Sequence, residues 1–265
     1  MTGFRTAELS DPAIPAEGLR FMTVKSAALG GRADLTLFAP PDVPKDTPVI
    51  LLLHGVYGSH WAWALKGAAH ITAARLIAEG ALPPAILCMP SDGLWDDGSG
   101  YVRHDSQDFE HWVIEEAPAA ARLAYGAGPS PLLVCGLSMG GFAALRLAGK
   151  YPERIAAASA HSALTEAAQL DTLIEESRAS WSGAAEDISV LAALRSAPSP
   201  LPPLRFDCGL EDPFLPANRA LHRALTETGI PHHYEEQPGG HDWAYWSRMI
   251  EASLRFFGTI LIERR

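Results

Sequence analysis

The sequence predicts an α/β fold built on a doubly wound, mostly parallel sheet with an antiparallel hairpin near its N-terminal end. Short apolar runs, typical of strands buried on both faces, recur along the chain. These runs are residues 49–53, 85–89, 132–135, 155–160 and 204–208. Segments with helical patterning separate them, which predicts parallel strands joined by helices. Ahead of the first run, residues 21–29 and 34–38 alternate in polarity around Gly30 and Gly31, which predicts the hairpin.

The helices are predicted between these strands, and one more strand precedes the last helix. The predicted helices are residues 61–79, 108–125, 139–150, 162–196, 216–229 and 242–257, and the last strand is 232–237. Gly80 and Gly229 end two of the helices, because glycine readily adopts the conformation required after a last turn. Pro118 predicts a kink or an early end in the second helix. Residues 1–20 are predicted to be a loose lead-in, and residues 91–106 a long polar loop.

The length and composition favour a single domain over residues 1–265, with residues 162–200 as a candidate for a small cap. The chain has 265 residues, of which 48% are hydrophobic, and a net charge of −10. An acidic chain without a cluster of basic residues is a poor binder of nucleic acid or anionic membranes. No segment approaches the ~20 apolar residues of a membrane span. The three cysteines lie in strand-like runs, and together with the lack of a clear targeting segment they favour a cytoplasmic protein.

A serine bounded by two glycines follows the strand predicted at 132–135. Gly136, Ser138 and Gly140 form a G-x-S-x-G pattern between this strand and a helix, which is the context of a nucleophile elbow. Such a turn is sharp, so it holds the serine in a strained conformation with its hydroxyl exposed at the sheet edge. A side chain at either glycine would collide with the opposite arm of the turn. Ser138 is therefore the candidate nucleophile.

A base and an acid for Ser138 are expected on loops at the carboxyl ends of the later strands. His241 lies in a Gly-Gly loop after the last strand, and Asp212 lies on the loop after the strand at 204–208. A histidine titrates near neutrality, and a carboxylate fixes its tautomer and stabilises the imidazolium. The chain order Ser138, Asp212, His241 is that of α/β-hydrolases.

Several further residues compete for the roles of acid and base. Asp207 lies within its strand and would point along the sheet, whereas Glu211 shares a loop with Asp212. We favour Asp212 because Pro213 follows it and rigidifies the turn. The competitors of His241 among the 10 histidines are His161, His232 and His233.

The oxyanion of a tetrahedral intermediate needs two hydrogen-bond donors. The backbone amide of Met139, at the positive end of its helix, is the first candidate. The second is expected in the loop after residues 49–53, where Val56 is favoured and Tyr57 is the alternative.

Aromatic side chains are abundant near the predicted cleft loops. The candidates for substrate binding are Tyr57, Trp61, Tyr101 and Trp243. Asp92, Asp96 and Asp97 precede Gly98 without the spacing of an EF-hand, so a solvated loop is favoured over a cation site. We expect no metal and no other cofactor.

These motifs together resemble the "Putative esterase" family, which includes esterase D (S-formylglutathione hydrolase), tributyrin and feruloyl esterases, and mycolyltransferases. The segments that carry the resemblance are Leu51-Leu52-Leu53-His54-Gly55 with Gly58, Gly136-Leu137-Ser138-Met139-Gly140-Gly141, Gly209-Leu210-Glu211-Asp212 and Gly240-His241-Asp242-Trp243. The resemblance extends over residues 21–257. The resemblance implies an α/β-hydrolase fold, a Ser138–Asp212–His241 triad and an oxyanion hole made by the Val56 and Met139 amides.

The sequence thus predicts a serine carboxylesterase that acts on short-chain or small aromatic acyl esters, with a small-molecule ester as its partner. S-formylglutathione hydrolases carry a Ser-Gly-Leu-Thr-Cys type of segment where this chain has His54-Gly55-Val56-Tyr57-Gly58, so that substrate is disfavoured. An acyltransferase, thioesterase or peptidase with the same triad is one alternative. A non-catalytic binding protein is another, and the sequence leaves a homo-oligomer open.

Overall fold

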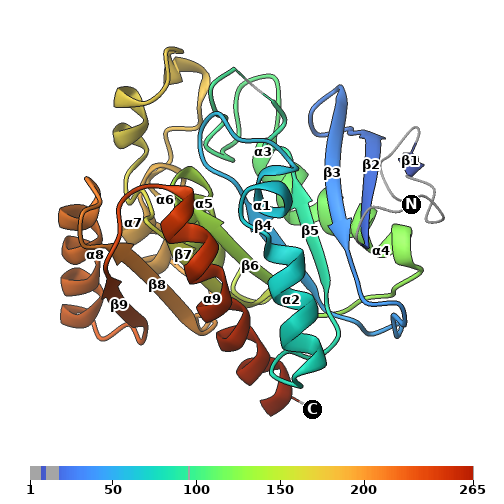
Figure 1. Ribbon diagram of the computed structural model, residues 1–265. Coiled ribbons are helices and arrows are strands. Elements are labelled where there is room, and N and C mark those ends of the chain that lie inside the picture. Colours follow the sequence, from blue (N-terminus) through green and yellow to red (C-terminus); the bar gives the residue numbers. More distant parts are fainter. Residues whose placement is uncertain (1–6, 10–17, 95, 265) are drawn as a thin grey trace.

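A nine-stranded sheet runs through the centre of the molecule (Figure 1). The structure, a computed structural model, describes residues 7–9, 18–94 and 96–264. The strands lie in the order β1-β2-β3-β5-β4-β6-β7-β8-β9. Their bounds are β1 Ala7–Leu9, β2 Leu19–Lys25, β3 Arg32–Phe38, β4 Val49–Leu53, β5 Ile86–Pro90, β6 Leu132–Leu137, β7 Ile155–His161, β8 Leu204–Gly209 and β9 His233–Gln237. β1 to β3 pair antiparallel, as do β3 and β5, and all other pairs are parallel, so the predicted fold class is confirmed.

Helices cover both faces of the sheet (Figure 1). One face is covered by α1 Ala62–Leu65, α2 Ala69–Ala78 and α9 Trp243–Glu263. The other is covered by α3 Phe109–His111, the π-helix Trp112–Glu116, α4 Ala117–Tyr125, α5 Met139–Lys150, α7 Val190–Arg195 and α8 Leu215–Glu227. The alternating side chains of β4 divide between the two cores: Val49, Leu51 and Leu53 enter one, and Ile50 and Leu52 the other. This division explains why the central strands are continuously apolar.

Two of the predicted helices are interrupted, each for a local reason. The helix predicted at 61–79 is two helices, because the chain turns at Ala68, whose φ is 49°. Next to it, a Cβ on Gly67 would lie 2.9 Å from the Trp243 ring, so only glycine fits there. The helix predicted at 108–125 is interrupted ahead of Pro118: the Ala117 amide bonds to the Trp112 carbonyl in a π-turn, which accommodates a proline that has no amide hydrogen.

The segment 162–196 differs most from its prediction as a helical region. It contains four short helices separated by turns: η2 Ala167–Thr172, η3 Arg178–Ser180, α6 Ala185–Ile188 and α7 Val190–Arg195. Ser177 and Ser189 start two of them, because their hydroxyls accept backbone amides of the following turn.

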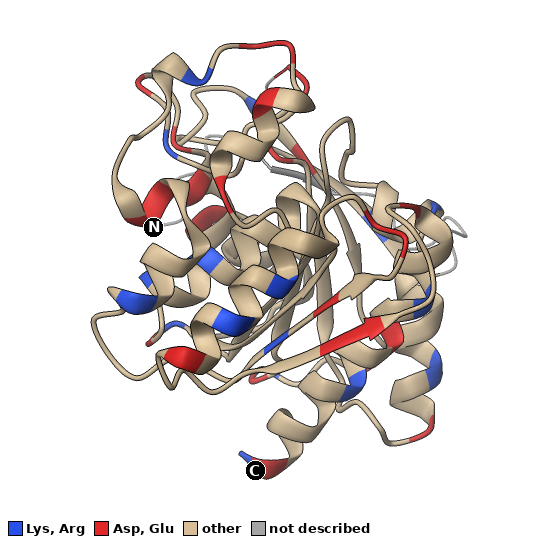
Figure 2. Ribbon diagram, turned by 90° about the vertical axis from the view of Figure 1, so that its left-hand side faces the viewer, with Lys and Arg blue, Asp and Glu red and all other residues tan. Residues whose placement is uncertain are grey.

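The remaining differences lie near the chain ends. β1 falls within the predicted lead-in; residues 1–6 and 10–17 of that lead-in lie outside the described residues. α9 extends six residues beyond its predicted end at 257, because Ile260 and Leu261 remain buried. Acidic and basic segments are interspersed on the face shown in Figure 2. No helix in the described part of the chain is both long and apolar enough to cross a membrane.

Candidate active site

The turn between β6 and α5 is as sharp as its sequence predicts. Ser138 has φ 53° and ψ −118°, an unfavourable conformation for a residue with a side chain. A Cβ on Gly136 would lie 2.1 Å from the Gly140 carbonyl oxygen, which is the predicted collision with the opposite arm. A Cβ on Gly140 would instead lie 2.2 Å from the Leu53 carbonyl oxygen, at the end of β4. The second glycine therefore lets α5 approach the neighbouring strand.

The structure brings Ser138, His241 and Asp212 together in one hydrogen-bonded chain. Ser138 Oγ lies 3.0 Å from His241 Nε2, and His241 Nδ1 lies 2.9 Å from Asp212 Oδ2. A carboxylate can only accept, so Nδ1 of a neutral His241 carries the hydrogen and Nε2 is left to accept from the serine. Asp212 is buried, and its other oxygen accepts the Phe214 amide at 2.8 Å, so its orientation is fixed.

Two aromatic side chains hold the imidazole of His241 from either side of the loop. Phe214 and Trp246 contact it edge-on, with ring centroids 5.1 and 5.0 Å away. Trp246 is anchored in turn by its indole N–H, which donates to Ser162 Oγ at 3.2 Å. The histidine retains a partly exposed edge, with 21% of its side chain accessible. It can therefore exchange protons with a substrate or with water.

The loop after β4 is held by a buried histidine. His54 Nδ1 donates to the Gly55 carbonyl at 2.7 Å, and its Nε2 accepts the Asp92 amide at 3.0 Å, so this imidazole is neutral. A Cβ on Gly58 would lie 2.5 Å from His54 Nδ1, which explains the glycine at this position.

The backbone amides of Val56 and Met139 have no hydrogen-bond acceptor among the described residues. By contrast, the Tyr57 amide donates to the Asp97 carbonyl at 2.9 Å. Of the two amides that the sequence offered for the second oxyanion donor, Val56 is thus the one that remains available.

A cavity of about 340 Å³ opens beside Ser138 and His241. Its lining includes three of the four predicted substrate-binding residues, Tyr57, Trp61 and Trp243. It also includes Lys66 and Leu173, which the sequence did not indicate. A lysine at a helix end and a leucine in an irregular segment carry no sequence signal of a binding role.

The prediction that Tyr101 binds substrate is wrong, because Tyr101 does not line the cavity. Its side chain is completely buried, and its hydroxyl donates to the His54 carbonyl at 3.2 Å. Tyr101 thus supports the loop after β4 from beneath and does not line the cavity. The polar loop that contains Tyr101 folds inward, because the buried Arg146 donates a hydrogen bond to the Tyr101 carbonyl at 2.7 Å.

Asp207 and His161, which competed for the roles of acid and base, form a separate, fully buried cluster. His161 Nδ1 lies 2.8 Å from Asp207 Oδ2, and His161 Nε2 lies 2.9 Å from Ser253 Oγ. Arg205 and Tyr245 also donate to Asp207, at 2.5 and 2.7 Å. Burial by itself lowers the pKa of His161, but the carboxylate of Asp207 outweighs it and raises the pKa to about 9. The buried pair is therefore ionised, and it joins β7, β8 and α9 beneath the site.

Glu211, His232 and His233 lie away from the nucleophile. Glu211 accepts the Gly239 amide at 2.6 Å and so shapes the loop that carries His241. His232 lies 2.8 Å from His222, and His233 is exposed beside Glu235. None of the three is therefore placed to act on Ser138.

The polar loop after β5 is held by the carboxylate of Asp92. Asp92 accepts the amides of Leu94 and Ser99 at 3.0 and 2.8 Å. Among the described residues, no group of three or more His, Cys, Asp or Glu side chains is placed to hold a metal ion.

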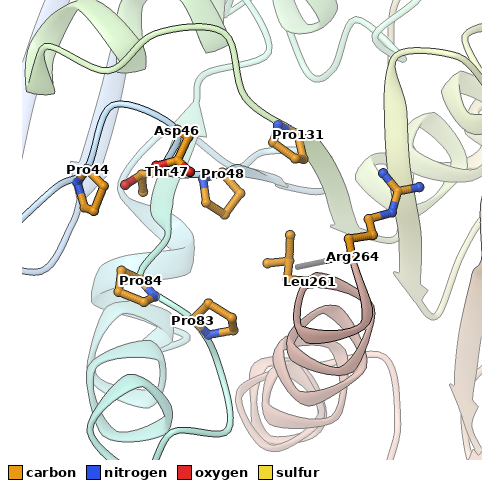
Figure 3. A pocket seen from close by; sticks show the side chains of 9 residues that line it. All are labelled: Pro44, Asp46, Thr47, Pro48, Pro83, Pro84, Pro131, Leu261 and Arg264. Atoms are coloured by element: carbon orange, nitrogen blue, oxygen red, sulfur yellow. The ribbon is translucent and has the colours of Figure 1, made fainter.

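A second hollow, of about 400 Å³, lies at the opposite end of the sheet (Figure 3). It is lined mainly by prolines that precede β4, β5 and β6: Pro44, Pro48, Pro83, Pro84 and Pro131. Asp46, Thr47, Leu261 and Arg264 complete its lining (Figure 3). No serine, cysteine or histidine is among these lining residues.

The family model described as "Putative esterase" matches residues 26–257. The chain belongs to this family. An acetyl esterase of Caldicellulosiruptor saccharolyticus is 26% identical over 235 residues, which are 80% of this chain and 83% of that protein. The chain is therefore a hydrolase, and its family and this relative support ester hydrolysis.

Solved structures of other proteins share the fold of this chain. A ferulic acid esterase superposes with a TM-score of 0.75 and 24% identity, over 96% of this chain and 99% of that one. A fluorophosphonate-binding serine hydrolase of Staphylococcus aureus superposes with a TM-score of 0.74 and 21% identity, over 90% of this chain and 97% of that one. The esterase therefore has the α/β-hydrolase fold that its motifs imply.

Proposed function

We propose that this esterase hydrolyses short-chain or small aromatic acyl esters through an acyl-enzyme on Ser138. The observation that carries the proposal is the hydrogen-bonded chain from Ser138 through His241 to Asp212, with distances of 3.0 and 2.9 Å, at the wall of a cavity. An isolated serine hydroxyl is a weak nucleophile, and this arrangement supplies the base that it needs.

In the first half of the proposed reaction, Ser138 Oγ attacks the ester carbonyl carbon as His241 Nε2 takes its proton. The carbonyl π electrons move to oxygen and form a tetrahedral oxyanion. Asp212 holds the Nδ1–H of His241 and stabilises the imidazolium that results. The intermediate then collapses, the alcohol leaves with the proton from Nε2, and the acyl group remains on Ser138.

The Val56 and Met139 amides are the proposed donors to the oxyanion. Both are free of other acceptors in the described part of the chain, and Met139 lies at the positive end of α5. Donors fixed in place before the reaction stabilise the developing charge without reorganisation. The buried His54, which holds the loop of Val56, acts as a positioning residue in this scheme.

In the second half of the proposed reaction, water replaces the alcohol. His241 removes a proton from the water as its oxygen attacks the acyl carbon. The second tetrahedral intermediate collapses to a carboxylic acid, and Ser138 Oγ regains its proton from Nε2. Apart from the ester and the water, no group outside the chain is required for either half.

The preference for small acyl groups follows from the lining of the cleft. Its volume of about 340 Å³ is at the small end of ligand pockets, and Trp61, Trp243 and Trp246 contribute rigid aromatic walls. The hydroxyl of Tyr57 donates to the Leu173 carbonyl, which joins the loop after β4 to the segment 162–200 at the cavity wall. The relative named an acetyl esterase and the fold neighbour named a ferulic acid esterase agree in kind with this preference.

A series of p-nitrophenyl esters with acyl chains of increasing length tests the proposal. We expect kcat/KM to be highest for the acetyl to butyryl esters and to fall with longer chains. A maximum at long chains would contradict the substrate assignment but not the mechanism. Turnover of thioesters or transfer of the acyl group to added alcohols, at rates above hydrolysis, would favour a thioesterase or an acyltransferase.

A further inference from the structure

One basic side chain of the catalytic cleft has no part in the proposed chemistry. Lys66 follows α1 and lines the cavity beside Trp61 and Trp243. The other lining residues are apolar, aromatic or uncharged, apart from the proposed base His241. In a mostly apolar binding site, a few placed polar or charged groups fix the orientation of the ligand and provide specificity.

The protein provides no counter-ion for this lysine within the described residues. The ion pairs there use other basic side chains, and Lys66 takes part in none of them. Its Nζ lies over the ring of Trp243, 5.8 Å from the centroid. Lys66 is an exposed residue at the edge of this cavity, in a chain that has more acidic than basic residues, 31 against 21.

The position of Lys66 is built by close packing. Its backbone amide bonds to the Ala62 carbonyl at 2.9 Å, which ends α1 at this point. The next residue, Gly67, approaches both Trp63 and Trp243 so closely that a Cβ would lie 2.9 Å from each. The main chain of Lys66 is thereby fixed against the aromatic wall, and the cation–π contact draws its ammonium to the same wall.

Negative charge gathers at another part of the cleft mouth. Partial desolvation raises the pKa of the Tyr57 hydroxyl, and the negative charges of Asp97, Glu175 and Glu176 raise it further. The Asp97 carboxylate accepts the Glu175 amide at 3.0 Å, which holds these two acidic residues close together. None of the three lines the cavity. An anionic group on a substrate is repelled from this side and attracted to Lys66.

We propose that the natural substrate of the cleft is an ester that carries a carboxylate, and that Lys66 binds this carboxylate. The inference rests on the proposed function, since it assigns the substrate class of the same site. Lys66 is a specificity-determining residue in this account, and it takes no part in bond making or breaking. The aromatic walls bind the uncharged part of the ester, and the charge of Lys66 selects its anionic end.

Two pairs of substrates test the inference, because the carboxylate can lie on either side of the scissile bond. On the acyl side, mono-4-nitrophenyl glutarate is compared with 4-nitrophenyl butyrate. On the alcohol side, 4-acetoxybenzoate is compared with its methyl ester. The readout is the ratio of kcat/KM for the charged ester to that for its neutral partner, in the wild type, Lys66→Met and Lys45→Met. Methionine preserves the apolar stem over Trp243, and Lys45 precedes β4 at the far end of the sheet.

We expect Lys66→Met to lower this ratio about fivefold for at least one pair, with the neutral esters changed less than twofold. Lys45→Met should leave both ratios unchanged, and the wild-type ratio should fall toward that of Lys66→Met as salt is added. Equal ratios in the wild type and Lys66→Met for both pairs, with neutral esters still hydrolysed, would overturn the inference alone. Absence of turnover of every ester would overturn the proposed function and the inference with it.

Discussion

The esterase contains two serine–histidine–aspartate groups that differ little in geometry and greatly in surroundings. In the cleft, Ser138, His241 and Asp212 are joined by distances of 3.0 and 2.9 Å. Beneath it, Ser253, His161 and Asp207 are joined by 2.9 and 2.8 Å. Hydrogen-bond distances therefore do not distinguish a catalytic group from a structural one in this molecule.

The surroundings do distinguish them. The buried group has no access to a ligand, its histidine is held as a cation, and Arg205 balances the charge of Asp207. Its serine lies inside α9, where the backbone amides are used within the helix. The cleft group instead has a serine on a strained turn, two unused amides and a partly exposed histidine. We propose that Ser138 is a nucleophile because a substrate can reach it and because two backbone amides beside it are free to donate. The three side chains alone are not sufficient.

The largest difference is expected from removing each serine in turn. Ser138→Ala should lower kcat for p-nitrophenyl acetate by about three orders of magnitude or more, with the fold retained. Ser253→Ala removes a buried hydroxyl but no reacting group, so it should keep kcat within a few-fold and lower the free energy of unfolding by about 1–2 kcal/mol. Steady-state rates and urea denaturation measure both effects. Equal losses of activity in Ser138→Ala and Ser253→Ala would contradict the assignment of one group to catalysis and the other to stability.

Exchanging the two aspartates for asparagine should separate activity from stability. Asp212→Asn permits the wrong tautomer of His241 and should reduce kcat by up to about 10⁴-fold, with little change in stability. Asp207→Asn removes the carboxylate that holds the proton on His161 and leaves Arg205 paired with Glu235 alone, which should cost about 3–5 kcal/mol of unfolding free energy. Circular dichroism during urea titration gives the free energy of unfolding of each variant. The measured kcat is then divided by the fraction of the variant that is folded under the assay conditions. An Asp207→Asn protein of wild-type stability would refute the structural role.

The buried histidine should make stability depend on pH on the alkaline side. Its pKa is about 9 in the folded protein and about 6.5 when unfolded, so its contribution is fully present below pH 6.5 and is lost as pH rises through 9. The loss should be on the order of 3 kcal/mol. His161→Asn can still donate to Asp207 but does not titrate, so its unfolding free energy should change less between pH 6.5 and 9.5. Parallel curves for the two proteins would show that His161 does not bind the proton.

The smallest effect is expected at the loop that carries the proposed oxyanion donor. A Cβ on Gly58 would meet the buried ring of His54, so Gly58→Ala should displace Val56. We expect kcat to fall about 10- to 100-fold while KM changes little, because the loss concerns the oxyanion. Gly30→Ala offers a control, since no atom lies within 4 Å of the added Cβ, although its φ of 63° makes the change mildly destabilising. A change in KM alone at Gly58→Ala would point to substrate binding instead.

The fold and the three central residues were predictable because each has a strong local cause. Buried parallel strands must be apolar on both faces, and the turn at Ser138 admits only glycine at Gly136 and Gly140. Strand order then brings Asp212 and His241 to the same edge as Ser138. Asp207 was disfavoured because it lies within its strand, and His241 was favoured over His161 because it lies in the Gly-Gly loop after the last strand.

The cleft walls were less predictable because they depend on packing between distant segments. Tyr101 has the aromatic character of a cleft residue, but its loop is drawn inward by Arg146 and its hydroxyl by His54. Leu173 reaches the cavity because Tyr57 binds its carbonyl from another loop. Lys66 faces the cleft because α1 ends where Gly67 meets Trp243. None of these contacts leaves a periodic or spaced pattern in the sequence.

The most direct test of the proposed nucleophile is mass spectrometry of the protein after reaction with a fluorophosphonate. We predict one covalent adduct per chain, located on Ser138, that forms in the wild type and in Ser253→Ala and is absent from Ser138→Ala. An adduct on another residue, or labelling that persists in Ser138→Ala, would contradict the assignment of Ser138 as the residue that takes the acyl group.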